Sequence, residues 1–288
     1  MKMKLPRFQK GLTPILIVVI VAAFLLVGGG AFYFATNLNK PVQIKEKASL
    51  TQDIFEDYRD SIKDISDHLQ KKYNTDTLSL ERELQKGKGL IKTAEETSSK
   101  LKPQVEKLTL SEVKEYKNKI NEYIGKSEKL LTLEKESMKL LEGYIDPLKQ
   151  YEELTVSLGG ISNYIYSDPK RYTTAVGAAV EKENKIISSL EAISVEGEMK
   201  KYHEAFVKNL KSERDLLQQI MKAVEERDSN AIAASEKKYV ESQQENTREF
   251  NRVADELEDK VKTTSKDCEN LSDDIKKIYD NLKGKYNF

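Results

Sequence analysis

The side chains best suited to chemistry are scarce in this sequence, which has two histidines, His68 and His203, and one cysteine, Cys268. A metal site needs a second His or Cys at a spacing that brings both to one helix face, and neither histidine has one. Glu204 adjoins His203, but adjacent residues do not face each other on a helix. We therefore expect both histidines to be surface or half-buried residues and Cys268, at a core position of a helical repeat, to be a small apolar filler.

Acidic pairs are frequent, but charged residues make up 33% of the chain, so such pairs are expected on solvated helix faces. The pairs considered are Glu95-Glu96, Glu225-Glu226 and Asp273-Asp274. The sequence contains no GxxxxGK(S/T) phosphate loop, no GxGxxG dinucleotide motif and no HExxH zinc motif. It therefore predicts no catalytic, metal-binding or cofactor-binding residue, and we expect a protein that is not an enzyme.

Residues 159–179 differ in composition from the rest of the chain, which is rich in Lys and Glu. They combine tyrosines and basic residues with few acids, and the candidate contact residues are Tyr164, Tyr166, Lys170, Arg171 and Tyr172. Aromatic residues and arginine are enriched at protein contact surfaces. The same composition also fits a packed bundle tip that buries its tyrosines. Both interpretations stay open at this point.

The charge balance of the body, residues 41–288, argues against nucleic acid as a partner. Five of the 48 basic residues precede residue 41 and none of the 48 acids does, so the body holds 43 basic and 48 acidic residues, a net charge of about −5. Binding to phosphates needs a concentrated basic face, and here the two signs are mixed. The single cysteine excludes a disulfide framework.

Apolar residues recur at helical spacing throughout the body, which predicts an all-α fold. The expected helices cover 49–73, 79–103, 113–145, 169–193, 195–224 and 231–284, and the last carries an apolar heptad pattern over about five heptads. A stripe three residues wide per heptad is typical of bundle helices. We therefore expect residues 49–288 to form an elongated antiparallel helical bundle with coiled-coil-like helices.

Local signals set the expected ends of these helices. The segment from Thr109 to Glu112 predicts a capping box. Asp168 followed by proline predicts a helix start, and Pro147 predicts a bend or a stop. A bend is also expected at 263–265. The segments 112–116 and 198–202 resemble each other (EVKEY and EMKKY), which suggests a duplicated helical hairpin.

Residues 14–36 form a stretch of 23 residues without a charge, which is enough for a helix to cross a hydrocarbon core of about 30 Å. The residues before it include four bases and no acid, so the N-terminus is expected in the cytoplasm and the C-terminus outside. The predicted domains are a cytoplasmic basic N-terminus at 1–13, a transmembrane helix at 14–36, a polar linker at 37–48 broken by Pro41, and an extracytoplasmic bundle at 49–288.

The segment around Gly11 and Leu12 (Lys10-Gly11-Leu12-Thr13-Pro14-Ile15), followed by an apolar run, resembles a prepilin-type (class III) signal over residues 7–30. The resemblance implies processing between Gly11 and Leu12. Leu16 stands where bacterial type IV pilins usually have Glu, which argues against pilus assembly. Similar openings occur in uncharacterised single-span envelope proteins, and a cleaved secretory signal is a further alternative. Neither resemblance extends into the body.

These observations together predict a single-pass membrane protein with its body outside the cytoplasm, acting by binding or scaffolding in the cell envelope. Its expected partners are the lipid bilayer, through 14–36, and an envelope protein or a second copy of the chain. A pilin-like filament subunit and a sensor ectodomain that acts through a partner are the alternatives.

Overall fold

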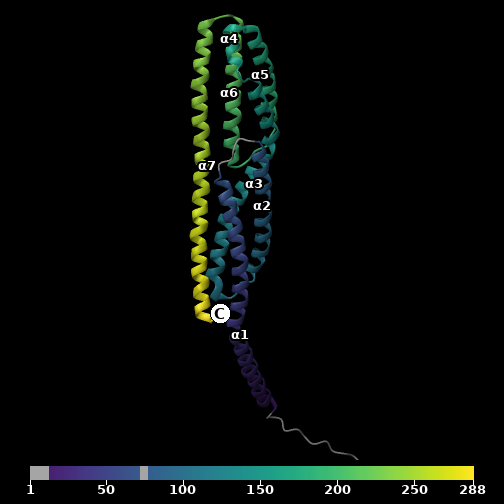
Figure 1. Cartoon of the computed structure of the whole chain (residues 1–288). Helices are drawn as coiled ribbons and strands as arrows, with labels where there is room; N and C mark the ends of the chain where they lie inside the picture. Colours follow the sequence, from purple (N-terminus) through teal and green to yellow (C-terminus); the bar gives the residue numbers. More distant parts are fainter. Residues whose placement is uncertain (1–12, 72–76) are drawn as a thin grey trace, which may run out of the picture.

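Figure 1 shows the computed structural model of the chain, which describes the backbone of residues 13–71 and 77–288 and the side chains of 40–71 and 79–288. Within these residues all regular structure is helical. The helices are α1 (Thr13–Leu69), α2 (Thr77–Glu106), η1 (Ser111–Val113), α3 (Lys114–Ser157), η2 (Ile161–Asn163), α4 (Tyr164–Ser167), α5 (Pro169–Glu191), α6 (Met199–Glu225) and α7 (Ser229–Tyr286). The predicted all-α bundle is confirmed.

Two long helices, α3 and α7, run antiparallel along the whole bundle (Figure 1). Lys126 of α3 pairs with Asp267 of α7, with 2.7 Å between Nζ and Oδ2. α1 packs against α3 and the last part of α7, and α2 packs along α3 as far as Lys149, which pairs with Glu81; we call the part of the bundle that contains α1 and α2 the proximal half. α5 and α6 pack against the other parts of α3 and α7, and we call this the distal half. The chain leaves the bundle through α1 at the proximal end, beside the C-terminus (Figure 1).

The core of the proximal half is rich in large side chains that are fully buried. Phe55 and Tyr58 of α1 meet Tyr123 of α3 in edge-to-face contacts, with ring centroids 5.0 and 6.1 Å apart. The Tyr58 and Ser127 hydroxyls are 2.8 Å apart, so the buried phenol has a polar partner. Ile275 of α7 is 0% exposed in the same cluster. Edge-to-face aromatic pairs of this kind contribute about 0.5–1.5 kcal/mol beyond area burial.

The distal half has a smaller second core near its tip, where α4, α5, α6 and the start of α7 meet. Its buried members are Ile165, Tyr172, Val176, Val180, Ile220, Ala223, Val224 and Ile232. Below this tip, the seam between α6 and α7 is largely polar. Ser212 and Ser242 hydroxyls lie 2.8 Å apart, and Asn246 donates to Ser242 at 3.4 Å.

Glycines allow close packing where the two halves meet. A Cβ added at Gly87 of α2 would lie 2.1 Å from Met138 Sδ, and one added at Gly143 of α3 would lie 2.8 Å from Ile193 Cδ1. Real Cβ atoms essentially never come this close to another heavy atom. An added methyl group at either position would force the Met138 or Ile193 side chain to shift, which favours glycine there despite its cost of about 1 kcal/mol within a helix.

The predicted linker at 37–48 is helical in the structure. α1 continues through Pro41, and Ile44 and Ala48 are 1% and 0% exposed in the proximal core. Proline removes one helical hydrogen bond, but burial of the following turn favours the helix. The expected break was wrong because the proline rule considers only the local backbone.

Two further local signals were also wrong. Pro147 lies buried inside α3, which continues to Ser157, so the expected stop was wrong, and the alternative of a bend stays a prediction. The expected capping box at 109–112 does not form, because the N-cap residue is Leu110 and makes no side-chain cap bond. Glu112 instead accepts a hydrogen bond from Lys40 of α1 at 3.1 Å.

The predicted polar start of α5 is confirmed, and the structure shows a second polar cap at the start of α7. Asp168 caps α5 by accepting from the backbone N–H of Arg171 at 3.1 Å, and proline follows it at the first helical position. Asp228 caps α7 by accepting from the N–H groups of Asn230 and Ala231, both at 3.0 Å. α7 then runs unbroken for 58 residues, through the bend expected at 263–265. The segments proposed as a repeat lie at the starts of α3 and α6, and the duplication stays a prediction.

In the part of the chain whose side chains are described, none of the helices is long and apolar enough to cross a membrane. The predicted cytoplasmic segment at 1–13, the predicted transmembrane side chains at 14–36 and the candidate processing residues Gly11 and Leu12 lie outside that part. These predictions therefore stand as they were made.

Candidate functional site

The structure places all three residues singled out for chemistry inside the bundle. His68 is 1% exposed and His203 is 8% exposed, so the prediction of surface or half-buried histidines was wrong. His203 Nδ1 lies 2.8 Å from the Tyr144 hydroxyl, and burial lowers the pKa of this histidine. Cys268 is confirmed as a core residue, and burial raises the pKa of its thiol to about 11, far from that of a reactive thiolate.

A buried ionic cluster links three helices in the proximal half. His68 Nδ1 of α1 lies 2.7 Å from Glu134 Oε1 of α3, and His68 Nε2 lies 3.1 Å from Glu83 Oε2 of α2. Lys71 donates to the other Glu83 oxygen. The Lys71 hydrogen bond, together with the charges of Lys71 and His68, holds the pKa of Glu83 below its usual range.

This cluster is suited to holding helices together rather than to catalysis. Each ring nitrogen of His68 faces a carboxylate oxygen, so the imidazole bridges Glu83 of α2 and Glu134 of α3. His68 then has no ring nitrogen left to bind a metal or to accept a proton from a substrate. In the described residues, no group of three or more His, Cys, Asp or Glu side chains is arranged to hold a metal ion.

The distal half contains a different kind of acidic cluster. Glu183 of α5 is 1% exposed, and within the described part of the chain neither of its carboxylate oxygens has a hydrogen-bond partner. Glu213 of α6 lies beside it and accepts from the Tyr151 hydroxyl of α3 at 2.8 Å and the Tyr239 hydroxyl of α7 at 3.0 Å. Burial, and then the charge of Glu213, raises the pKa of Glu183 to about 8.

The five candidate contact residues lie at the distal tip, but they divide into two groups. Tyr172 is 3% exposed and belongs to the distal core. Tyr164 is half-buried, with the Arg171 guanidinium 4.1 Å from its ring centroid. Tyr166 is 66% exposed, and Lys170 is also exposed. The tip is therefore packed at its base, through Tyr172, and leaves one tyrosine and two cations at its surface.

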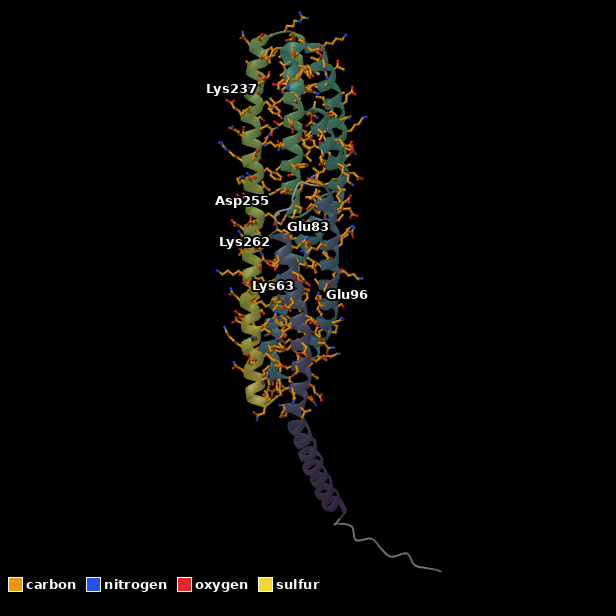
Figure 2. All side chains as sticks on the ribbon, viewed as in Figure 1. Lys63, Glu83, Glu96, Lys237, Asp255 and Lys262 are labelled. Atoms are coloured by element: carbon orange, nitrogen blue, oxygen red, sulfur yellow. The ribbon has the colours of Figure 1, made fainter. Side chains whose placement is uncertain are left out.

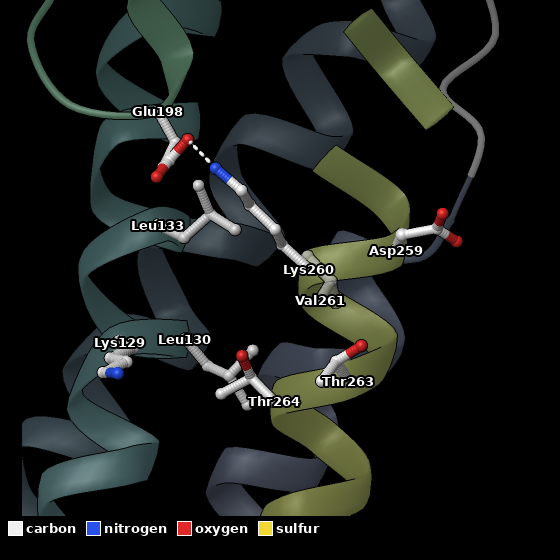
Figure 3. Close-up of a pocket in the computed structure, with 9 residues that line it drawn as sticks. All are labelled: Lys129, Leu130, Leu133, Glu198, Asp259, Lys260, Val261, Thr263 and Thr264. Carbon is white, nitrogen blue, oxygen red and sulfur yellow. Dashed lines mark hydrogen bonds and ion pairs between the residues drawn. The ribbon is translucent and has the colours of Figure 1, made fainter. Parts of the chain in front are cut away.

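A pocket of about 430 Å³ opens between α3 and α7 near the middle of the bundle (Figure 3). Leu130 and Leu133 of α3 project toward it, and Lys260 of α7 reaches across it to pair with Glu198 (Figure 3). Its lining combines apolar side chains with charges of both signs. It thus lacks the convergent set of polar groups that orients a ligand.

The acidic pairs lie where the sequence predicts. Glu95, Glu96, Glu225, Glu226 and Asp273 are exposed and Asp274 is half-buried. Figure 2 shows side chains projecting from the bundle on the sides in view, with Glu96 and Lys237 on its outer surface. The bundle surface is therefore covered by charges of both signs.

Sequence reasoning missed Glu83, Glu134 and Glu183, although their positions carried a signal. Glu134 stands four residues from both Leu130 and Met138, and Glu183 stands three residues after Val180 and four before Ile187. An acidic side chain within an apolar helical stripe faces the core unless the helix turns that position toward solvent. This pattern would have identified both residues as buried carboxyls.

No protein-family model, characterised protein or solved structure matches this chain.

Proposed function

We propose that this chain is a single-pass membrane-anchored, extracytoplasmic helical protein that acts by binding or scaffolding in the cell envelope. The observation that carries the proposal is the continuity of α1. One helix covers the apolar stretch at 14–36 and enters the bundle, where Ile44 is buried. A helix without a flexible joint would hold the bundle upright on the bilayer.

The dimensions of the bundle support a spacing role. α7 has 58 residues, and at about 1.5 Å per residue it is about 87 Å long. With the proximal end next to the bilayer, the distal tip stands about that far from it. A rod of this length presents a binding surface well beyond the lipid headgroups.

The distal tip is the proposed contact surface. Tyr166 and Val156 are 66% and 76% exposed there, and Lys170 and Arg171 lie nearby. An exposed aromatic residue beside cations is typical of the residues that dominate binding at protein interfaces. The partner is an envelope protein or a second copy of the chain.

Topology and binding are tested separately in intact cells. Protease added outside should remove the body and leave a small membrane-bound fragment, and carbonate washing should leave the full-length protein in the membrane. A body that the protease cannot reach would contradict the proposed topology. Crosslinking from the tip should then be lost in a Tyr166→Ala, Arg171→Glu variant and retained in a Lys237→Glu variant, which changes an exposed lysine on α7.

A pilin-like filament subunit is the second candidate, and it is favoured by the Lys10-Gly11-Leu12 sequence before the apolar run. Mass spectrometry of the mature N-terminus separates the two. A chain that begins at Leu12 supports processing of the prepilin kind, and a chain that retains Met1 removes this candidate.

A further inference from the structure

Glu183 is the one carboxyl among the described residues with both oxygens buried and without a hydrogen-bond partner. It lies on the face of α5 that packs against α3 and α6. An ionised carboxylate in such a place, with no hydrogen-bond donor, costs several kcal/mol, so the group takes up a proton instead. The environment thus selects the neutral acid.

None of the groups described around Glu183 forms an ion pair with it, so its negative charge is neutralised by a proton. Tyr151 from α3 and Tyr239 from α7 both donate to Glu213, which adds a negative charge beside Glu183. Arg214 is the nearest cation, but its guanidinium bonds Asp215 at 2.6 and 2.9 Å and Asn184 at 3.1 Å.

The polar contacts between the helices around this acid are few, and α5 is held mainly by buried apolar side chains such as Val180, Ile186 and Ile187. Tyr239 reaches Glu213 from α7, and the α6–α7 seam beside it is made by serine hydroxyls. Lys211 pairs with Glu191 across α5 and α6, but both side chains are nearly half exposed, so the pair adds little. A local opening of α5 would therefore break few polar contacts, and its main cost is the exposure of these apolar side chains.

We propose that the distal half of the bundle is a proton-controlled device, in which the proton held on Glu183 keeps α5 packed against α3 and α6, and its loss releases α5 from them. The step moves one proton from the Glu183 carboxyl to water and breaks no covalent bond. In the open state Glu183 is hydrated and ionised, away from Glu213. This regulation is independent of which partner binds the distal tip.

The direction of the pH effect follows from linkage. The pKa of Glu183 is about 8 in the closed bundle and close to its ordinary value of 4.5 when the acid is hydrated. The closed form therefore binds more protons in this interval, and its stability falls as pH rises through it. The closed form is most stable in acid, and the pH effect levels off above the higher pKa.

Hydrogen exchange of the full-length protein in detergent tests the device, after correction for the pH dependence of intrinsic exchange. Protection of 172–190 in α5 should fall by roughly tenfold for each pH unit between about pH 5 and about pH 8 and then become constant. Protection of 80–101 in α2 should stay constant over the same range. Glu183→Gln keeps the shape of the side chain and removes its titration, so it should abolish the fall in α5.

Glu181→Gln is the matched control, since Glu181 is an exposed acid two residues away on the same helix, and it should behave as the unmodified protein does. If the Glu183→Gln variant does not fold, Glu183→Leu replaces it in the same experiment. This variant should also remove the pH dependence of protection in α5. The proposal is overturned if protection of α5 is independent of pH in the unmodified protein, or if Glu183→Gln and Glu181→Gln show the same pH dependence.

Discussion

The proximal and distal halves each bury a glutamate in an apolar helical stripe, and they neutralise it differently. Glu134 meets His68 at 2.7 Å, and Glu183 meets no partner among the described residues. The first acid joins two helices through an ionic hydrogen bond, and the second requires a proton from solvent. The same bundle thus contains one cluster that locks helices together and another that responds to its surroundings.

The two parts of α7 show the same contrast. Its proximal part buries apolar residues at regular spacing: Val261, Cys268, Leu271, Ile275 and Leu282. Between 229 and 257 only Ile232 and Val253 are buried, and polar groups such as Ser242 fill the intervening turns of the seam. Because apolar burial is the main stabilising term of a bundle, the distal half should be the less stable half.

The largest expected effect on stability comes from the buried ionic cluster around His68. His68→Leu leaves Glu83 and Glu134 facing each other without the imidazole, and the free energy of unfolding should fall by about 3–5 kcal/mol. Denaturant unfolding followed by circular dichroism measures this. The control His203→Leu removes one hydrogen bond, to Tyr144, and should cost about 1 kcal/mol. Equal losses in the two variants would contradict the special role of the cluster.

The same replacement in the distal half should have the opposite sign. Glu183→Leu removes a buried polar group without a partner, so the free energy of unfolding should rise by about 1–3 kcal/mol at neutral pH. The same unfolding assay measures it. A loss of stability would mean that Glu183 has a favourable interaction in the folded protein and that the contrast between the halves is wrong.

Close packing at the junction of the halves gives an effect of intermediate size. A Cβ at position 87 would lie 2.6 Å from Glu134 Oε1, and moving that oxygen weakens its bond to His68. Gly87→Ala should therefore cost about 1–3 kcal/mol. Gly89→Ala is a control in the same helix with open space around it, and it should stabilise by up to about 1 kcal/mol through helix propensity. Stabilisation by both would show that the contact at Gly87 relaxes freely.

The smallest effect is expected at the start of α7. Asp228→Ala removes a side chain that accepts from two backbone N–H groups at 3.0 Å, which should cost about 1 kcal/mol. In thermal unfolding, Asp228→Asn should keep most of the cap. If the alanine variant matches the unmodified protein, the distal end of α7 is already frayed.

Much of the fold could be predicted because it depends on repeated patterns. The apolar heptad pattern of the last helix is confirmed from Val261 to Leu282, because it repeats along the helix, and the Asp-Pro start at 168–169 is confirmed because it acts on the local backbone. Pro41 and Pro147 were misinterpreted because tertiary packing overcomes a single weak helical position. The partner contacts of Tyr166 and Arg171 remain predictions.

The buried carboxyls could be predicted only in part. An acid in an apolar stripe identifies Glu134 and Glu183 as unusual, but their neighbours come from other helices. His68 is 66 residues from Glu134 in the chain, and Tyr151 is 62 from Glu213. One sequence does not reveal which acid meets an imidazole and which meets another acid.

Hydrogen exchange along α7 at a single pH tests most directly whether the two halves differ in stability. One unbroken helix covers both halves, so differences in protection within it report packing rather than secondary structure. The amides of 232–250 should exchange much faster than those of 261–282 in the full-length protein. Equal protection of the two segments would contradict the account.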